Sequence, residues 1–282
     1  MTNPTVSIIV PTYNRPHFLE RALRTITAQT FRDFEIIVVN DAGSCVEDMV
    51  MKCDKAKLIN HTVNKGLAAS RNTGLRAAKG KYITFLDDDD VIFPVHFQVL
   101  VHELDKGTQA AYTDAYRWEN EEYLRRTLFV EYSKERLYAG CTFYVMSVML
   151  RREVFDGHWF DESLPSHEDY DMWLTLSEDN IDFVHLPFIT AAYSQRGDGS
   201  QISHKPYHKG YYDKVRAKHN VDHIVPIWEQ KPKDIIMRYR VLKSFTGRVL
   251  GVTRHLTQGK ILDIESDVGS EYARAGYVER VE

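Results

Sequence analysis

The chain has 282 residues, a formal net charge of -4 at pH 7 and 43% hydrophobic residues. These values are ordinary for a globular enzyme with one large domain, or with one domain and an appendage, and they give no reason to expect a nucleic-acid partner. No apolar run is long enough to span a bilayer and the polar start lacks a signal-peptide core, so we expect a cytoplasmic protein. Cys45, Cys53 and Cys141 lack paired spacing, so we expect free thiols.

Strand and helix patterns alternate over the first third of the chain. Apolar, β-branched runs predict strands at residues 6–10, 34–39, 58–61 and 82–86. One helix should follow the first strand, with Asn14 as its N-cap and Pro16 in its first turn, and another should cover 67–79. The alternation predicts an α/β fold, with a mostly parallel central sheet flanked by helices and right-handed crossovers.

Four consecutive aspartates, Asp87 to Asp90, follow the fourth predicted strand. Carboxylates this close together cannot all ionise without a large energetic cost, so the run is either solvated or holds a cation. A solvated loop is the common fate of an acidic run. Ligands of open α/β sheets, however, bind at the carboxyl ends of strands, where this run lies. Because oxygen ligands suit Mg²⁺ and Mn²⁺, which bridge carboxylates to substrate phosphates, we favour a metal–diphosphate site.

The usual glycine-rich phosphate-binding loops are missing from the sequence. Residues 11–16 read PTYNRP at the place where a Rossmann domain carries its glycine-rich turn. Neither G-x-G-x-x-G nor the Walker pattern occurs. The sequence therefore argues against a Rossmann dehydrogenase and a P-loop nucleotide hydrolase.

The middle of the chain is less regular. We predict a helix at 95–104 and strands at 109–113 and 145–150. The irregular region 114–140 mixes aromatic and charged residues, which either stack on sugar rings or close a core. Apolar residues spaced at three and four positions after Asp169 predict a helix with this carboxylate in its first turn. The helix dipole favours carboxylates there, so a structural role for Glu168 and Asp169 stays open.

Four blocks of the sequence resemble family 2 inverting glycosyltransferases of the GT-A fold. In the expected order, over roughly the first 200 residues, they are VSIIVPTYNRP, FEIIVVNDAGS, NKGLAASRNTGLRAAKGKYITFLDDDD and FDESLPSHEDYDMWL. The resemblance implies transfer of one sugar from a nucleotide-sugar, with a UDP-sugar as the expected donor, to a hydroxyl of a glycan or lipid-linked acceptor. It also implies Mn²⁺ or Mg²⁺ as cofactor and a part in the synthesis of bacterial surface polysaccharide.

Matching the family motif residue by residue assigns the nucleobase pocket. Pro11, Thr12 and Tyr13 would line this pocket, and Asp41 would accept a hydrogen bond from the base. The alternative for Asp41 is an Asx-turn after a strand, which its neighbour Gly43 also permits.

The same match implies a donor loop and a helix that follows it. Lys65 and Gly66 correspond to the loop. Arg71 would meet the ribose or diphosphate region, and the alternative is a solvated arginine.

The acidic run can be matched to a D-x-D motif in two registers. The pair is either Asp87 with Asp89 or Asp88 with Asp90, and the resemblance to the family, through its spacing to Pro94, implies the first. Asp89 would then be the direct metal ligand, with Asp87 as a second ligand, and both Asp87 and Asp88 would belong to the donor site.

Asp169 matches the general base of the family. An inverting transfer is a single in-line displacement, in which a carboxylate removes the proton of the acceptor hydroxyl while a metal neutralises the leaving diphosphate. Family members often carry a further histidine after the last core strand. Here His204 is the candidate third metal ligand, although the sequence around it departs from the family pattern.

The tail after residue 208 lies outside the resemblance. Basic residues dominate 231–260 and acidic residues dominate the end of the chain, so we expect either a solvated helix pair with matched charges or a basic amphipathic helix on an anionic membrane surface. The second reading implies peripheral contact with the inner membrane face. A homo-oligomer also stays open. The expected domains are a glycosyltransferase domain at 1–208, with a nucleotide-sugar half at 1–113 and an acceptor half at 114–208, and a helical extension at 209–282.

Two other functions compete with this interpretation. A processive polysaccharide synthase needs transmembrane helices and a Q-x-x-R-W motif after the base, whereas Arg117 and Trp118 precede Asp169 and lack the glutamine. A noncatalytic nucleotide-sugar binding module is disfavoured by the intact acidic run and by Asp169.

Overall fold

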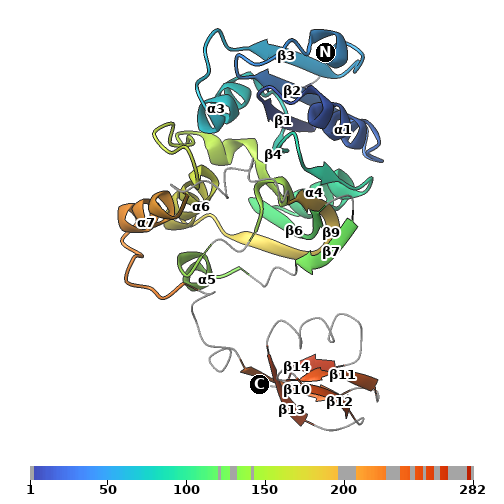
Figure 1. Cartoon of the computed structure of the whole chain (residues 1–282), viewed down its shortest axis with the longest axis vertical. Coiled ribbons are helices and arrows are strands. Elements are labelled where there is room, and N and C mark those ends of the chain that lie inside the picture. The colour runs from blue at the N-terminus through green and yellow to red at the C-terminus, as the bar shows by residue number, and fades with distance from the viewer. Residues whose placement is uncertain are drawn as a thin grey trace. The chain divides into compact units, whose positions relative to one another are not determined.

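The computed structural model describes residues 3–119, 122–127, 132–140, 143–195 and 208–226, together with strand segments between 236 and 280 (Figure 1). The chain divides into two compact units, Met1–Ile224 and Val225–Glu282.

Within the described residues, nine strands form one sheet at the centre of the first unit. Four of them run parallel in the order β3, β2, β1, β4. Their bounds are Val6–Thr12 for β1, Phe34–Asn40 for β2, Ala56–Asn60 for β3 and Tyr82–Phe85 for β4. The alternation of strands and helices predicted for this part of the chain is confirmed.

The remaining strands make the sheet mixed. β8 pairs antiparallel with β4 and β6, β9 is parallel to β6, and the short β5 and β7 pair antiparallel with β9 and β6. Their bounds are Val91–Ile92 for β5, Ala110–Glu119 for β6, Glu122–Thr127 for β7, Val148–Arg151 for β8 and Phe183–Ser194 for β9. The strand predicted at 109–113 thus continues to Glu119, because β6 pairs with β9 along its length, a long-range pairing that a local pattern does not reveal.

Helices flank the sheet of the first unit (Figure 1). Their bounds are Pro16–Thr27 for α1, Glu47–Val50 for α2, Leu67–Ala77 for α3, His96–Leu104 for α4, Lys134–Tyr138 for α5, Glu168–Glu178 for α6 and His208–Lys218 for α7. Two short 3-10 helices, η1 and η2, cover Val145–Ser147 and Arg152–Phe155. The strand predicted at 145–150 therefore begins later, at Val148, after η1.

The prediction of Asn14 as the N-cap of α1 is wrong. The N-cap position belongs to Arg15, and its side chain makes no capping hydrogen bond. Asn14 adopts a positive φ of 55°. Its Oδ1 instead accepts a hydrogen bond of 2.9 Å from the backbone N–H of Ser44, in the turn after β2. Pro16 opens the helix as predicted.

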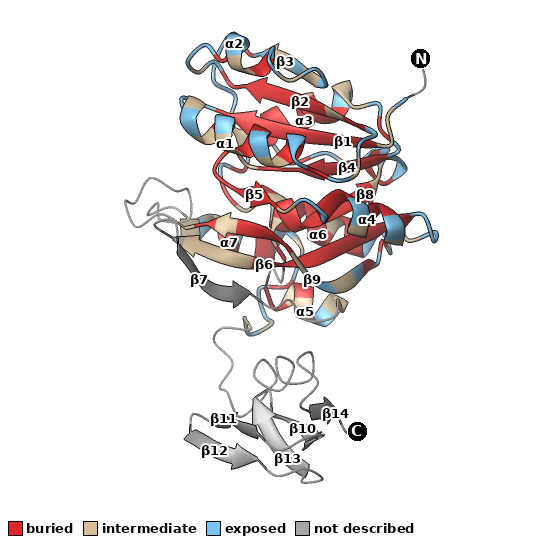
Figure 2. Ribbon diagram, turned by 90° about the vertical axis from the view of Figure 1, so that its right-hand side faces the viewer, coloured by how far each residue is buried: buried red, intermediate tan, exposed pale blue. Residues whose placement is uncertain are grey.

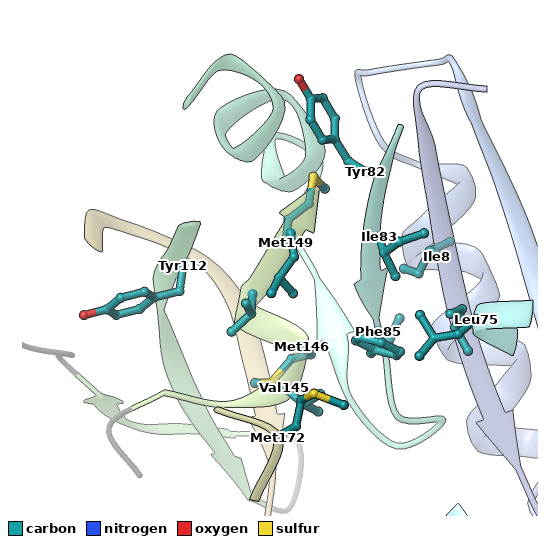
Figure 3. Packing of buried hydrophobic residues seen from close by; sticks show 14 of the residues in the cluster. Ile8, Leu75, Tyr82, Ile83, Phe85, Tyr112, Val145, Met146, Met149 and Met172 are labelled. Atoms are coloured by element: carbon teal, nitrogen blue, oxygen red, sulfur yellow. The ribbon is translucent and has the colours of Figure 1, made fainter. Parts of the chain in front are cut away.

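The core lies between the sheet and its helices (Figure 2). All seven residues of β1 are buried, and Leu19, Leu23 and Ile26 form the buried face of α1. Figure 3 shows Leu75 of α3 beside Phe85 of β4, and both belong to one buried apolar cluster. This packing gives the polar ends of the strands a rigid support.

The described residues of the second unit from 236 to 280 form strands, so the predicted helical extension is wrong for these residues. β10 pairs antiparallel with β13 and β14, and β11 pairs with β12. The bounds are Ile236–Val241 for β10, Phe245–Val249 for β11, Val252–Leu256 for β12, Ile261–Glu265 for β13 and Val278–Arg280 for β14. Within 209–282, the described helix is α7, which belongs to the first unit.

The same strands rule out the basic amphipathic helix expected within 231–260. The basic residues Arg238 and Arg240 occupy alternate positions of β10, the two-residue period of a strand. Arg238 pairs in register with Asp263, and Arg240 with Glu279. Residues of opposite charge thus occupy paired positions of a sheet. The helix prediction was wrong because it rested on the total charge of the 231–260 segment and overlooked the two-residue period of its basic residues. Among the described residues, no helix combines the length and apolar character that crossing a membrane requires.

Candidate active site

The polar residues predicted to bind the donor come together at the carboxyl ends of β1, β2 and β4. The parallel register pairs Thr12 with Asn40 and Ile9 with Phe85, so the segments that follow these strands leave the sheet at one edge. Thr12 Oγ1 donates a hydrogen bond of 2.8 Å to Asp88 Oδ2. The end of the first strand therefore contacts the acidic run directly.

Asp41 holds the loop that leads into α3. The backbone N–H groups of Lys65 and Gly66 donate hydrogen bonds to its two carboxylate oxygens, each at 2.8 Å. Gly66 has a φ of 92°, a conformation that favours glycine, and it is the N-cap residue of α3. The turn after β2 is closed by a different residue, because Asn40 Oδ1 accepts from the N–H of Gly43 at 3.0 Å. Asn40, and not Asp41, therefore forms the Asx-turn after β2. A hydrogen bond from a nucleobase to Asp41 stays a prediction.

His61 also contacts Asp41, and the sequence analysis did not single it out. Its Nδ1 lies 2.7 Å from Asp41 Oδ1, and its Nε2 lies 2.9 Å from Oγ1 of Thr73 on α3. The histidine thus connects the carboxylate to the helix. Its place immediately after β3, at the same edge as Asp41, is the signal that could have identified it.

Two members of the acidic run, Asp88 and Asp89, share one arginine. Arg15 Nη1 lies 3.3 Å from Asp88 Oδ1 and 3.3 Å from Asp89 Oδ2. Burial, followed by the charge of Asp89, raises the pKa of Asp88 to about 7, although Arg15 and the Thr12 hydroxyl oppose this shift. The expectation that these carboxylates do not all ionise readily agrees with this shift.

The other two members, Asp87 and Asp90, have separate partners. Asp90 is fully buried and accepts a hydrogen bond of 2.8 Å from the N–H of Ser194 at the end of β9. Burial, followed by the charge of Asp89, raises its pKa well above the ordinary value. Asp87 Oδ1 accepts a hydrogen bond of 2.7 Å from Arg71. The side chain of Asp87 is 27% exposed and that of Asp89 is 12% exposed, against 5% for Asp88.

Arg71 connects the acidic run to the start of α6. Its side chain is 1% exposed, so it is no solvated arginine, and it binds Glu168 through Nη1 and Asp87 through Nη2. Burial by itself lowers the pKa of this guanidinium, but the charges of Asp87, Glu168 and Asp169 raise it above its ordinary value. The predicted contact of Arg71 with ribose or diphosphate stays a prediction, since the described geometry commits both terminal nitrogens to carboxylates.

Glu168 and Asp169 lie in the first turn of α6, as predicted. Burial raises the pKa of Glu168 to about 7, Arg71 opposes this shift, and Asp169 adds to it. Burial also raises the pKa of Asp169, again against Arg71. Glu168 is buried and bound to Arg71, whereas Asp169 keeps part of its surface exposed. Of the two carboxylates, Asp169 is therefore the more exposed.

His204 lies outside the described residues, but another histidine contacts the segment before α6. The ring of His208, on α7, lies 3.9 Å from the ring of His167. Ser166 Oγ lies 2.6 Å from Nδ1 of His208 and 3.0 Å from Nδ1 of His167. Sequence reasoning missed this contact, because α7 lies beyond the matching blocks.

The acidic run offers carboxylate ligands for a divalent cation. Asp87 and Asp89 offer the hard oxygen ligands that Mg²⁺ and Mn²⁺ take. Within the described part of the chain, no group of three or more His, Cys, Asp or Glu side chains is arranged to bind a metal. The residues therefore fit a metal held by one or two carboxylates together with diphosphate oxygens, which is how Mg²⁺ is commonly bound.

A cavity of about 260 Å³ adjoins the loop that contains Lys65 and Gly66. It is lined by Lys65 and Gly66, by the first residues of α3, by the 162–165 segment and by Tyr211 of α7. The loop that Asp41 fixes thus forms one wall of a space that a small molecule can enter.

This architecture is the GT-A fold of glycosyltransferases. The family model described as "Glycosyl transferase family 2" matches residues 7–159. The chain belongs to this family. The match ends before Glu168 and Asp169.

Relatives with sequence similarity are also glycosyltransferases by name. The uncharacterized glycosyltransferase YwdF of Bacillus subtilis (strain 168) is 30% identical over 229 residues, which cover 77% of this chain and 84% of that protein. WcaA of Escherichia coli (strain K12), named as a candidate colanic acid biosynthesis glycosyl transferase, is 30% identical over 62% of this chain and 66% of its own. The chain spans only 27% of the length of a relative from Rickettsia bellii and 54% of EpsJ from Bacillus subtilis.

Solved structures share the fold at low sequence identity. TarS 1-349 of S. aureus in complex with UDP-GlcNAc has a TM-score of 0.62 at 19% identity, covering 78% of this chain and 72% of that one. The mannosyltransferase PcManGT of Pyrobaculum calidifontis, in complex with GDP-Man and Mn²⁺, has a TM-score of 0.57 at 19% identity, covering 79% and 64%.

Proposed function

We propose that the protein is an inverting, metal-dependent glycosyltransferase that moves one sugar from a nucleotide-sugar to a hydroxyl of a glycan or lipid-linked acceptor. The main support for this proposal is that Arg71 forms ion pairs with both Asp87 and Glu168. This buried arginine brings the acidic run and the carboxylates of α6 into one site, although they are far apart in the sequence. A donor-binding group and an acceptor-activating group are what a one-step transfer needs.

The donor half of the site would be built from the ends of the parallel strands. Pro11, Thr12 and Tyr13 would line the nucleobase pocket, and Asp41 would fix the loop beside it. A bound Mg²⁺ or Mn²⁺ would neutralise charge on the leaving diphosphate, held by Asp89 with Asp87. The greater exposure of Asp87 and Asp89 than of Asp88 supports this register over Asp88 with Asp90.

Asp169 would act on the acceptor. Its carboxylate would take the proton of the acceptor hydroxyl as that oxygen forms a bond to the anomeric carbon, while the bond from this carbon to the diphosphate oxygen breaks. Attack from the face opposite the diphosphate inverts the configuration. Arg71 would hold Glu168 and thereby the first turn of α6, so that Asp169 stays directed at this position.

A UDP-sugar donor and a part in polysaccharide synthesis complete the proposal. TarS, whose fold is similar, was solved with UDP-GlcNAc, and the name of WcaA refers to a polysaccharide. PcManGT, however, was solved with GDP-Man. UDP-sugars and GDP-sugars should therefore be assayed side by side.

The test is donor hydrolysis and calorimetry with a panel of nucleotide sugars and nucleoside diphosphates, with and without Mn²⁺. We expect Asp89→Ala to abolish metal-dependent binding, because an ion held by few carboxylates cannot lose one without a large loss of affinity. Binding equal to that of the parent in both conditions would show that the assigned register is wrong. A parent that binds the donor but never transfers or hydrolyses it would favour the noncatalytic binding module.

A further inference from the structure

Arg15 occupies the space between two carboxylates of the acidic run. One of its terminal nitrogens lies 3.3 Å from an oxygen of Asp88 and 3.3 Å from an oxygen of Asp89. One positive charge thus bridges two neighbouring negative charges. A divalent cation held at Asp89 would relieve the same repulsion.

Among the described residues, three arginines contact the acidic run, and they differ in how firmly they are held. Arg71 is buried between two carboxylates. Arg21 donates a hydrogen bond of 2.6 Å to the backbone carbonyl of Asp89 and packs 4.4 Å from the ring centre of Trp118. Arg15 has a side chain that is 32% exposed, and both of its bonds to the run are 3.3 Å long. Of these three arginines, Arg15 would lose the least interaction energy if its side chain moved away from the run.

We propose that Arg15 is a built-in counter-cation that neutralises the acidic run in the donor-free enzyme, gives way to the incoming metal, and then binds the diphosphate of the donor. This proposal rests on the proposed function. The backbone of Asp89 stays in place throughout because Arg21 holds its carbonyl. Only side chains move, and guanidinium groups bind phosphate oxygens well.

If Arg15 moves from the aspartates to the diphosphate, its removal should have opposite effects on metal binding and on nucleotide binding. Without nucleotide, Arg15 competes with the metal for Asp89, so its removal strengthens metal binding. With nucleotide, the guanidinium contributes to diphosphate binding, so its removal weakens nucleotide binding. An arginine that only repels the metal, or only supports the fold, does not give this reversal.

The experiment measures Mn²⁺ binding by electron paramagnetic resonance, first for the metal alone, and then nucleotide binding by calorimetry with UDP and GDP at saturating Mn²⁺. Arg15→Ala should bind Mn²⁺ alone roughly two- to fivefold more tightly than the parent, the range expected for losing a partly exposed competing charge. Its affinity for the preferred nucleotide should fall roughly tenfold or more, since a charge-assisted pair is lost. Arg15→Lys keeps the charge and should match the parent for Mn²⁺ alone within roughly twofold.

Arg24→Ala is the matched control. Arg24 lies on the same helix and carries the same charge, but it pairs with Glu20 in solvent. This variant should match the parent in both measurements.

Unchanged or weaker Mn²⁺ binding by Arg15→Ala would overturn the counter-cation role. Stronger binding of both Mn²⁺ alone and nucleotide would overturn the transfer of Arg15 to the diphosphate. A parent that binds neither nucleotide in the presence of Mn²⁺ would instead overturn the proposed function, and this proposal with it.

Discussion

Asp169 is the residue on which the proposed chemistry depends most. Asp169→Asn keeps the shape of the side chain but cannot take a proton. We therefore expect donor affinity to stay near the parent value while turnover falls by roughly 10²-fold or more, the usual contribution of a general base. Turnover, donor affinity and melting temperature should be measured on one preparation. A lowered melting temperature, with activity lost only in proportion to unfolded protein, would instead mark a structural carboxylate, and parental turnover would direct attention to Glu168.

Glu168 should make stability depend on pH in a defined direction. Burial raises its pKa from 4.5 to about 7, so the native state binds this proton more tightly than the unfolded chain does. Its stabilising contribution is therefore complete below about pH 4.5 and is lost as the pH rises through about 7. Glu168→Gln removes this titration, so the parent should lose stability relative to the variant across that window. Melting curves between these pH values test it, and parallel curves would show that Glu168 does not titrate there.

The position of the site residues on α3 depends on how closely this helix packs on the sheet. Gly74 lies on the face of α3 that meets β1, where a Cβ atom would come within 2.3 Å of Cγ2 of Ile9. Gly74→Ala should therefore destabilise the protein by roughly 1 to 3 kcal/mol, the usual penalty of overpacking. Gly210→Ala in α7 is the control, because its Cβ would meet no atom within 4 Å. That substitution should be neutral or slightly stabilising, since alanine favours helix. Equal melting temperatures for the two variants would contradict the close packing.

The division of the chain into two units predicts that the first unit folds and binds donor by itself. A chain ending at Ile224 keeps all strands and helices of the described site. It should match the full chain in nucleotide affinity and in the melting of the first unit. Loss of cooperative unfolding on truncation would contradict the division. Sedimentation of both forms with anionic vesicles then tests whether the second unit contacts membranes, and equal sedimentation would remove that idea.

Local sequence patterns predicted the type and order of most elements in the first unit. Hydrophobic period, Pro16 and the polar ends of the strands are local signals, so the β-α-β alternation, the acidic run at a strand end and the carboxylates in the first turn of α6 could all be predicted. The same approach failed for the second unit, where total charge was weighed above the two-residue period of β10.

Which side chains meet depends on how the chain folds in three dimensions. Arg71 reads as a donor ligand or a solvated arginine in the sequence, but folding buries it between Asp87 and Glu168, 16 and 97 positions away. Arg15 and His61 acquire their partners in the same way, across separate strands. Local patterns encode whether a segment is strand or helix, whereas contacts of this length depend on how the elements pack. For that reason the residues that connect the two halves of the candidate site emerge only from the fold.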